Sequence, residues 1–156
     1  MTTIVLKTKI KAPVENVFDL SRDIDFHQKS ASQTHETAIG GVTSGLINFG
    51  ENVTWRGKHF GVYLQHTSKI TAFERPLKFT DVMTKGHFTY FVHQHLFETL
   101  EDETLMIDIL TYKTPFGILG KAFDTVLLKK HLTKFLKQRN QQIQKELENF
   151  KPMPAS

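Results

Sequence analysis

The sequence predicts a single α+β domain in which one long C-terminal helix lies across a curved antiparallel sheet of about seven strands. Two patterns lead to this prediction. Short segments in which apolar and polar residues alternate follow one another between turn residues, as in half-buried strands. Residues 118–149 instead carry apolar side chains at helical spacing. One helix across a strongly curved sheet leaves space between the two layers, and we expect two short helices after the first strand to close one end of it.

Composition places the chain among globular proteins with one hydrophobic core. It has 156 residues, of which 39% are hydrophobic and 23% are charged, enough for one domain. We assign residues 1–150 to that domain and residues 151–156 to a frayed tail. Cysteine is absent, which excludes disulfides, thiolate metal ligands and a thiol nucleophile, and favours a reducing compartment. The sequence shows neither a signal peptide nor a bilayer-spanning apolar run, so we expect a cytoplasmic protein.

The net charge of +4 is a local feature, because it arises mainly from lysines near the C-terminus, and we expect no nucleic-acid partner. These basic residues most simply form the solvent-exposed face of a helix, and the alternative is that they contact a membrane surface. The thirteen phenylalanines suit the wall of an apolar cavity and a plain core equally well. The basic residues in question are Lys129, Lys130, His131, Lys134 and Lys137.

The N-terminal part of the chain predicts a strand followed by two short helices. Residues 3–11 alternate between apolar and charged side chains, the pattern of a half-buried strand. A helix should begin at Pro13, whose missing N–H costs nothing in the first turn, where Glu15 is also favourable. Residues 24–29 predict the second helix, and residues 36–39 predict a further short strand.

A glycine-rich connection, residues 40–50, leads from there into a hairpin. It lacks the spacing of a phosphate-binding loop, so we expect no nucleotide site, and it is either a mobile loop or the lip of a cavity. Residues 51–60 and 62–73 predict two strands that turn at Phe60 and Gly61. Their pairing places Trp55 opposite His66, Gly57 opposite Leu64 and His59 opposite Val62.

Residues 77–85 predict the next strand, with Phe79 and Asp81 on one face. The face that they share with the following strand depends on the length of the connection. A three-residue connection places Phe79 beside His93 and Asp81 beside Phe91. A two-residue turn would move both side chains to the other face.

Residues 91–97 and 104–112 form the central hairpin of the prediction. With a turn centred on Glu101 and Asp102, opposed residues have numbers that sum to 203. One face then carries aromatic rings, a thioether, two imidazoles and a carboxylate, a mixture suited to a lined cavity, and we take it as the inner face. The opposed pairs on this face are Phe91 with Tyr112, His93 with Leu110, His95 with Asp108, and Phe97 with Met106.

The predicted C-terminal helix carries two apolar stripes that are rotated about its axis. A straight helix on one sheet needs only one stripe. The rotation of the apolar stripe along the helix, its drift, therefore indicates a bend, a second contact such as a dimer, or a helix held by a curved sheet. The early stripe consists of Leu119, Phe123, Val126 and Leu127, and the late stripe of Leu128, Leu132, Phe135, Leu136, Ile143 and Leu147.

The order of elements and several short motifs resemble the START/birch-pollen-allergen-like (SRPBCC) helix-grip superfamily. The motifs are APVENVF (12–18), GGVTSG (40–45), VTWR (53–56), HFG (59–61), HQHLF (93–97), TLMID (104–108) and PFGILG (115–120). The resemblance extends over residues 3–147 and is strongest to the bacterial branch described as cyclase/dehydrase-like or cell-division-inhibitor-like. It implies a helix-grip fold and a hydrophobic ligand cavity between the sheet and the long helix, but it names neither a ligand nor a reaction.

Our leading hypothesis is that the chain binds a small hydrophobic or amphipathic molecule in this cavity. Histidine and aspartate side chains would orient the polar head of the ligand, and apolar side chains would enclose its body. The residues expected to contact the ligand are Trp55, His59, His66, Phe79, Asp81, Phe91, His93, His95, Phe97, Met106, Asp108, Tyr112 and Phe123.

The second hypothesis is a cofactor-independent enzyme of the polyketide cyclase/aromatase type. Asp108 would orient His95 as a general base for a proton next to a carbonyl, although the sequence identifies neither a nucleophile nor an oxyanion donor. A third hypothesis is an interaction module whose partner surface is the late apolar stripe, with a dimer through the long helix as one form of it.

The two histidines of the central strand also raise the question of a metal. His93 and His95 on one strand face can bind zinc, with Asp108, His59 or His66 as further ligands. A cross-strand hydrogen bond between His95 and Asp108 is the simpler account, because it satisfies two polar groups on a half-buried surface. We therefore expect neither a metal nor another cofactor.

Overall fold

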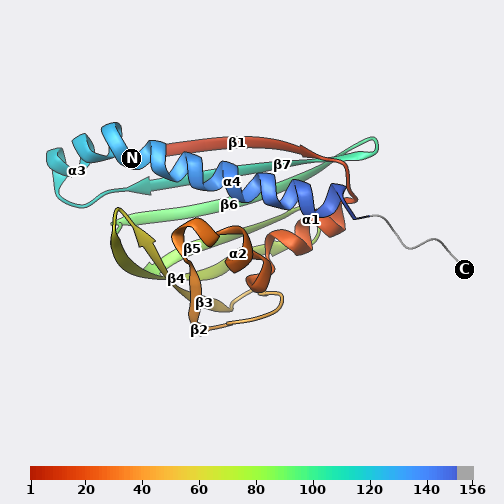
Figure 1. The fold of residues 1–156 in the computed structure, drawn as a ribbon, viewed down its shortest axis with the longest axis horizontal. Coiled ribbons are helices and arrows are strands. Elements are labelled where there is room, and N and C mark those ends of the chain that lie inside the picture. Colours follow the sequence, from red (N-terminus) through yellow and green to blue (C-terminus); the bar gives the residue numbers. More distant parts are fainter. Residues whose placement is uncertain (151–156) are drawn as a thin grey trace, which may run out of the picture.

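The computed structural model describes residues 1–150, which form one seven-stranded antiparallel sheet and a set of helices (Figure 1). Across the sheet the strands follow the order β1-β7-β6-β5-β4-β3-β2, so the first strand lies beside the last. The predicted frayed tail lies outside the described residues. The strands are β1 (Thr2–Ile10), β2 (Thr37–Gly41), β3 (Asn52–His59), β4 (Val62–Glu74), β5 (Lys78–Lys85), β6 (Tyr90–Leu100) and β7 (Glu103–Lys113).

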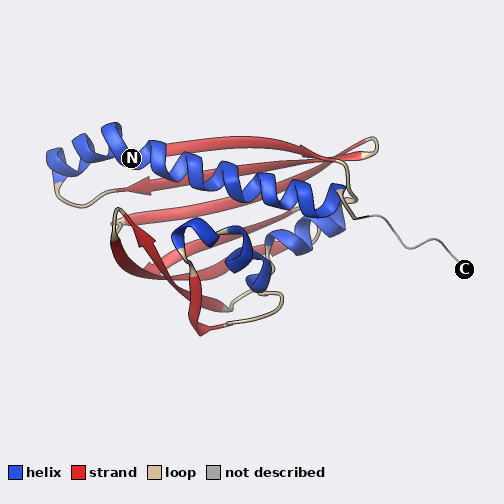
Figure 2. Cartoon of the chain, viewed as in Figure 1, coloured by secondary structure: helices blue, strands red, loops and turns tan. Residues whose placement is uncertain are grey.

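Two short helices follow β1 and one long helical segment follows β7, which is the helix-grip arrangement that the sequence predicts. The short helices pack against the long one and lie between it and the β2–β3 end of the sheet (Figure 2). Within residues 1–150, none of the helices is both long and apolar enough to cross a membrane. The helices are α1 (Val14–Ser21), α2 (Ile24–Ser30), the 3₁₀ turn η1 (Ser32–Thr34), α3 (Gly117–Phe123), the π-helical turn η2 (Asp124–Leu128) and α4 (Lys129–Glu148).

The π-helical turn η2 explains why the apolar stripe of the C-terminal helix drifts. A π turn contains more residues than an α turn, so it rotates the following residues about the axis. Leu128 at the end of this turn, and Leu136 and Ile143 after it, belong to the late stripe and are buried. The late stripe is therefore not the exposed partner surface that the third hypothesis requires. The exposed side chains are those of the early stripe, Leu119, Phe123, Val126 and Leu127.

The predicted strand registers hold in two hairpins and differ in a third. The central hairpin pairs His95 with Asp108, and the β3–β4 hairpin pairs Trp55 with His66, as predicted. Between β5 and β6, however, Asp81 lies opposite His93 instead of Phe91, a shift of two residues. Phe79 likewise lies opposite His95 instead of His93. The cause is the connection, residues 86–89, which is longer than the predicted three-residue turn. A two-residue shift preserves the face of each side chain.

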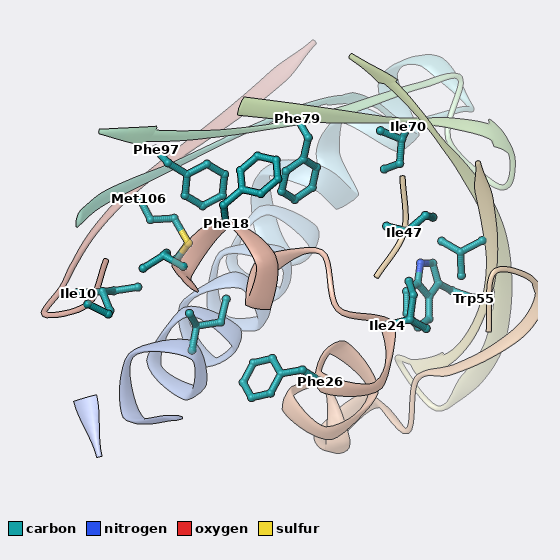
Figure 3. Packing of buried hydrophobic residues seen from close by; sticks show 14 residues of the cluster. Ile10, Phe18, Ile24, Phe26, Ile47, Trp55, Ile70, Phe79, Phe97 and Met106 are labelled. Carbon is teal, nitrogen blue, oxygen red and sulfur yellow. The ribbon is translucent and has the colours of Figure 1, made fainter. Parts of the chain in front are cut away.

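Phe18 of α1 is the centre of the apolar packing between the short helices and the sheet. Its ring is fully buried and makes edge-to-face contacts with Phe73, Phe79 and Phe97, at centroid distances of 5.2–5.4 Å. Figure 3 shows the rings of Phe18, Phe79 and Phe97 side by side beneath the strands. Such arrangements stabilise aromatic clusters beyond the area that they bury. This cluster fixes α1 against the sheet.

Replacing Phe18 with alanine should lower the free energy of unfolding by about 3–5 kcal/mol, because the cluster would lose its central ring and keep a cavity. Urea denaturation monitored by circular dichroism measures this change. Phe49→Ala is the matched control, since the side chain of Phe49 is 65% exposed, and it should change stability by less than about 0.5 kcal/mol. Equal losses in both variants would contradict the central role of Phe18.

Candidate functional site

A cavity of about 710 Å³ lies between the inner face of the sheet and the long helix, at the place where the sequence predicts one. Most of its wall is apolar and comes from strands β3 to β6 together with α2, α3 and α4. Its volume lies within the range of sites for drug-sized molecules. Representative apolar wall residues are Val53, Trp55, Ile70, Leu110, Leu132 and Leu136.

Histidine is concentrated at this cavity. Seven of the eight histidines of the chain belong to its wall, and the exception is His35. Strand alternation predicts four of them, but it does not predict His27 of α2, His87 of the β5–β6 connection or His131 of α4, and the expectation that His131 lies on the solvent-exposed side of the helix is wrong. The sequence did contain a signal that His131 could face the cavity, because this residue directly precedes Leu132 of the late apolar stripe. The histidines of the wall are His27, His59, His66, His87, His93, His95 and His131.

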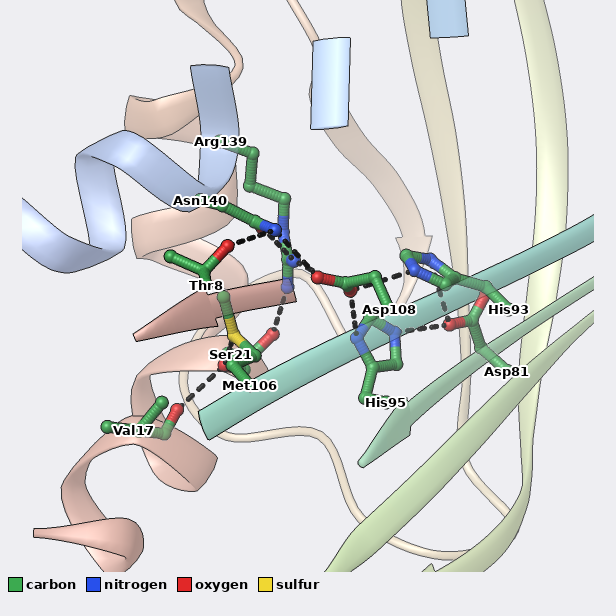
Figure 4. A network of polar contacts seen from close by, with 10 residues as sticks. All are labelled: Thr8, Val17, Ser21, Asp81, His93, His95, Met106, Asp108, Arg139 and Asn140. Atoms are coloured by element: carbon green, nitrogen blue, oxygen red, sulfur yellow. Dashed lines mark hydrogen bonds and ion pairs between the residues drawn. The ribbon is translucent and has the colours of Figure 1, made fainter. Parts of the chain in front are cut away.

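The first polar cluster at the wall is centred on Asp108, which has no exposed surface (Figure 4). Its Oδ1 lies 3.0 Å from Nε2 of His93 and 3.0 Å from Nδ1 of His95. The contact with His93 is a hydrogen bond. Nδ1 of His95 is close but poorly aligned, so it has no hydrogen-bond partner, and its interaction with the carboxylate is electrostatic only.

Asp81 contacts the opposite sides of the same two imidazoles. Its Oδ2 is hydrogen-bonded to Nε2 of His95 at 3.0 Å and lies 3.9 Å from Nδ1 of His93. Unlike Asp108, Asp81 belongs to the cavity wall, and its side chain keeps 20% exposure. The two carboxylates therefore hold the imidazoles between them, and only Asp81 is open to a ligand.

Residues Arg139 and Asn140 of α4 complete the cluster from the helix side. Nδ2 of Asn140 donates a hydrogen bond of 2.7 Å to Oδ2 of Asp108, and Nη1 of Arg139 lies 3.7 Å from Oδ1. Sequence reasoning missed both residues. A signal was present, because they lie between Leu136 and Ile143 on the buried stripe, where a polar side chain must have a buried partner.

The ionisable groups of this cluster shift the pKa values of one another. Burial alone would raise the pKa of Asp108, but the contacts from His93 and His95 outweigh it and hold this pKa well below its usual range. Burial lowers the pKa of His93, and the neighbouring His95 lowers it further. For His95, burial is outweighed by Asp108 and Asp81, so its pKa is raised. The two carboxylates thus lie near one guanidinium, on Arg139, and beside the imidazole of His95, whose pKa they raise.

A second polar cluster lies around Glu36, a buried residue that sequence reasoning did not select. Oε2 of Glu36 lies 2.6 Å from Nε2 of His27, and Oε1 lies 3.7 Å from Nε2 of His59. Nδ1 of His59 is in turn hydrogen-bonded to Nε2 of His131 at 2.9 Å. Burial would raise the pKa of Glu36, but the hydrogen bond with His27 and the contact with His59 outweigh it and lower that pKa.

The structure divides the residues predicted to contact a ligand into two groups. Phe97 and Met106 pack in the core with Phe18, Asp108 lies behind the imidazoles, and the hydroxyl of Tyr112 donates to Asp124. These four residues do not line the cavity. The predicted residues that do line it are Trp55, His59, His66, Phe79, Asp81, Phe91, His93, His95 and Phe123.

Comparison with known proteins bears on the fold. No protein-family model matches the chain, and no curated protein matches its sequence. Solved structures do match. A START superfamily protein of Mycobacterium smegmatis has a TM-score of 0.72 at 13% identity, covering 94% of this chain and 97% of that one. The ginseng major latex-like protein 151 of Panax ginseng has a TM-score of 0.70 at 16% identity, with coverages of 94% and 97%.

A third similar structure is that of the protein TTHA0849 from Thermus thermophilus, with a TM-score of 0.72 at 15% identity. The match covers 91% of this chain and 97% of that one. At such identities the likeness concerns the arrangement of helices and strands, and a shared fold does not by itself assign a function.

The lowered pKa of Glu36 predicts a pH-dependent contribution to stability. The folded state holds the carboxylate ionised at pH values where the unfolded chain, with a pKa of about 4.3, already binds a proton. This contribution is therefore fully present above about pH 5 and is lost as the pH falls toward the lower pKa of the folded state. Glu36→Gln should cost about 1–3 kcal/mol at pH 7, and its difference from wild type should shrink below about pH 4.

Urea denaturation at pH 7 and at pH 3.5 measures this difference. Glu98→Gln, which changes an exposed glutamate of β6, is the control and should differ from wild type by less than about 0.5 kcal/mol at both pH values. A cost of Glu36→Gln that does not change with pH would contradict the assigned role of Glu36.

Proposed function

We propose that this chain, whose fold is the START-like helix-grip fold, binds a small amphipathic molecule in its cavity. The observation that carries the proposal is an apolar cavity of about 710 Å³ with a carboxylate, Asp81, at its wall. Binding sites for small molecules are typically apolar with a few placed polar groups, and this cavity has that composition.

The chemistry of Asp81 limits the head group of the ligand. Burial would raise the pKa of Asp81, but the hydrogen bond with His95 and the proximity of His93 outweigh it and lower this pKa. Asp81 is therefore ionised at neutral pH and can only accept hydrogen bonds. A ligand with a hydroxyl or amino group at one end and an apolar body satisfies both Asp81 and the wall.

The cyclase-type hypothesis has less support. Asp108 has no exposed surface, and both ring nitrogens of His95 already face carboxylates. A general base must reach the proton that it removes, so His95 would have to break its hydrogen bond with Asp81 before it could act. We therefore favour binding over catalysis.

The proposal predicts that an apolar molecule enters the cavity and is excluded when the cavity is filled. Ser68 is buried at the wall, so Ser68→Phe should place a ring in the cavity and weaken binding by more than about tenfold. Trp55, the single tryptophan, lies at the wall, and its fluorescence reports ligand entry. The probe is a series of long-chain alcohols, and native mass spectrometry of the purified protein looks for a bound molecule.

Lys69→Phe is the matched control for Ser68→Phe. The residue is next in the same strand, its side chain is exposed, and the added ring should leave binding of the alcohols unchanged. Equal effects of the two variants would contradict binding in the cavity. The same conclusion would follow if no alcohol of the series changed the fluorescence of Trp55 and native mass spectrometry found only the bare chain.

The mouth of the cavity suggests where such a ligand is exchanged. Phe60, Phe116, Leu119 and Phe123 line the cavity and are also exposed, and Ile118 beside them is 87% exposed. Figure 1 shows α3, which carries several of them, extending past the ends of β1 and β7. Apolar tips next to basic residues are typical of segments that contact anionic membrane surfaces. The basic residues nearby in the chain are Lys121, Lys129, Lys130, Lys134 and Lys137.

We therefore expect the chain to bind vesicles that contain anionic lipid through α3. The double variant Phe116→Ser, Ile118→Ser should bind phosphatidylserine-containing vesicles at least about fivefold more weakly, because each lost apolar side chain removes buried area. Co-sedimentation with the vesicles measures this, and Phe49→Ser, at another exposed phenylalanine, is the control. Equal binding of all variants would contradict a membrane contact at α3. If the double variant instead had a different sedimentation coefficient from the wild-type protein, this would indicate a dimer through the same surface.

A further inference from the structure

Three side chains at the cavity wall present their donor atoms to one another. Asp81 on β5 and His93 and His95 on β6 each offer one atom, and these atoms all lie within 4.8 Å of one another. Oδ2 of Asp81 lies 3.9 Å from Nδ1 of His93 and 3.0 Å from Nε2 of His95, so we take these three atoms as the donors. The set arises from the β5–β6 register, since the predicted register would have put Asp81 opposite Phe91. From the sequence we expected no metal, because a hydrogen bond between His95 and Asp108 was the simpler account, and Asp81 was not among the ligands considered.

We propose that Asp81, His93 and His95 bind a divalent transition-metal ion at the wall of the cavity. Two imidazole nitrogens and one carboxylate oxygen form a donor set that suits zinc, iron(II) and cobalt(II). The separations of 3.0 Å and 3.9 Å between Oδ2 of Asp81 and the two nitrogens are close to those of ligands that share one ion at about 2.1 Å from each.

The second argument comes from the nitrogens that face away from the proposed ion. A metal-binding histidine usually donates its other ring N–H to a carboxylate, which fixes the ring and its tautomer. Here both rings direct that other nitrogen at the same oxygen, Oδ1 of Asp108, each at 3.0 Å. Asp108 is held in turn by Asn140 and Arg139 of α4. Buried support of this kind is what a preformed metal site requires.

The third argument is the unsatisfied nitrogen of His95. Its Nδ1 lies beside Asp108 without an aligned hydrogen bond, while its Nε2 is hydrogen-bonded to Asp81. An unpartnered buried nitrogen is costly. A cation bound by Nε2 and by Asp81 would replace their direct hydrogen bond, and the ring could then turn so that Nδ1–H donates to Asp108.

The position of the donors indicates what the ion would do. Three protein ligands leave coordination positions open, as in catalytic zinc sites and not as in closed structural ones. The three residues line the cavity, so the open positions would face it. A ligand with a carboxylate, an enol or a hydroxyl head could complete the coordination. The inference goes beyond the proposed function and does not depend on it, because the ion can be tested alone.

The experiment uses the full chain after treatment with a chelator, and the probes are Co²⁺ and Zn²⁺ without any organic ligand. Visible absorption of Co²⁺ and calorimetry with Zn²⁺ should show saturable binding of about one ion per chain. In wild-type protein, long-range proton–nitrogen NMR spectra should show the ion on Nδ1 of His93 and Nε2 of His95. This readout requires no variant.

Asp81→Asn is the decisive variant, since asparagine keeps the shape and a hydrogen-bonding oxygen but removes the charge. The substitution should weaken the binding of both ions by more than about tenfold, and His93→Gln should have the same effect. Asp102→Asn in the β6–β7 turn and His35→Asn outside the cavity are the matched controls, and both should bind as wild type does. Circular dichroism establishes that each variant is folded.

Three results would overturn the proposal. The first is the absence of saturable binding of Co²⁺ and Zn²⁺ by the folded wild-type protein. The second is a wild-type NMR spectrum in which the ion shifts the signals of other histidines and leaves those of His93 and His95 unchanged. The third is loss of binding in Glu36→Gln while Asp81→Asn retains it, which would place the ion at the second polar cluster. If no alcohol binds but the ion does, only the proposed function fails.

Discussion

The fully buried carboxylate of Asp108 connects the sheet to the long helix. A carboxylate removed from water is costly unless charged or hydrogen-bonding groups surround it. Its partners come from two directions, His93 and His95 on the neighbouring strand β6 and Arg139 and Asn140 on α4. Any slip of β6 against β7, or rotation of α4 about its axis, would remove partners from a buried charge. One side chain thereby fixes the relative position of three elements.

The cavity follows from the position of α4. This helix packs on β1, α1 and α2, and strands β3 to β6 face the cavity, whose wall also includes residues of α2 and α4. The first polar cluster lies at the boundary between the packed core and the cavity. Asp108 is fully buried, Asp81 belongs to the cavity wall, and the two imidazoles lie between them (Figure 4).

The sequence allows prediction of the central hairpin because its turn is short and a period of two then determines every opposed pair. The same reasoning fails between β5 and β6, where the length of the connection is not encoded in the alternation, and this failure concealed the approach of Asp81 to His95. The drift of the apolar stripe was visible, but its cause, a π turn, depends on backbone hydrogen bonds that the pattern does not determine. Arg139 and Asn140 could have been identified as polar residues on a buried stripe.

In the first polar cluster, the packing of the fold gives a reason for the carboxylate of Asp108 but not for that of Asp81. Replacing a buried ion pair with apolar groups of similar volume is often neutral or stabilising, so such a pair indicates either a positional role or a functional one. Asp108 has the positional role, because it joins β7 to β6 and α4. Within residues 1–150, the hydrogen bond and ion pairs of the Asp81 side chain involve only the two imidazoles that Asp108 already contacts, and this side chain keeps 20% exposure. The carboxylate that the fold does not require is therefore the one that a ligand or an ion would meet.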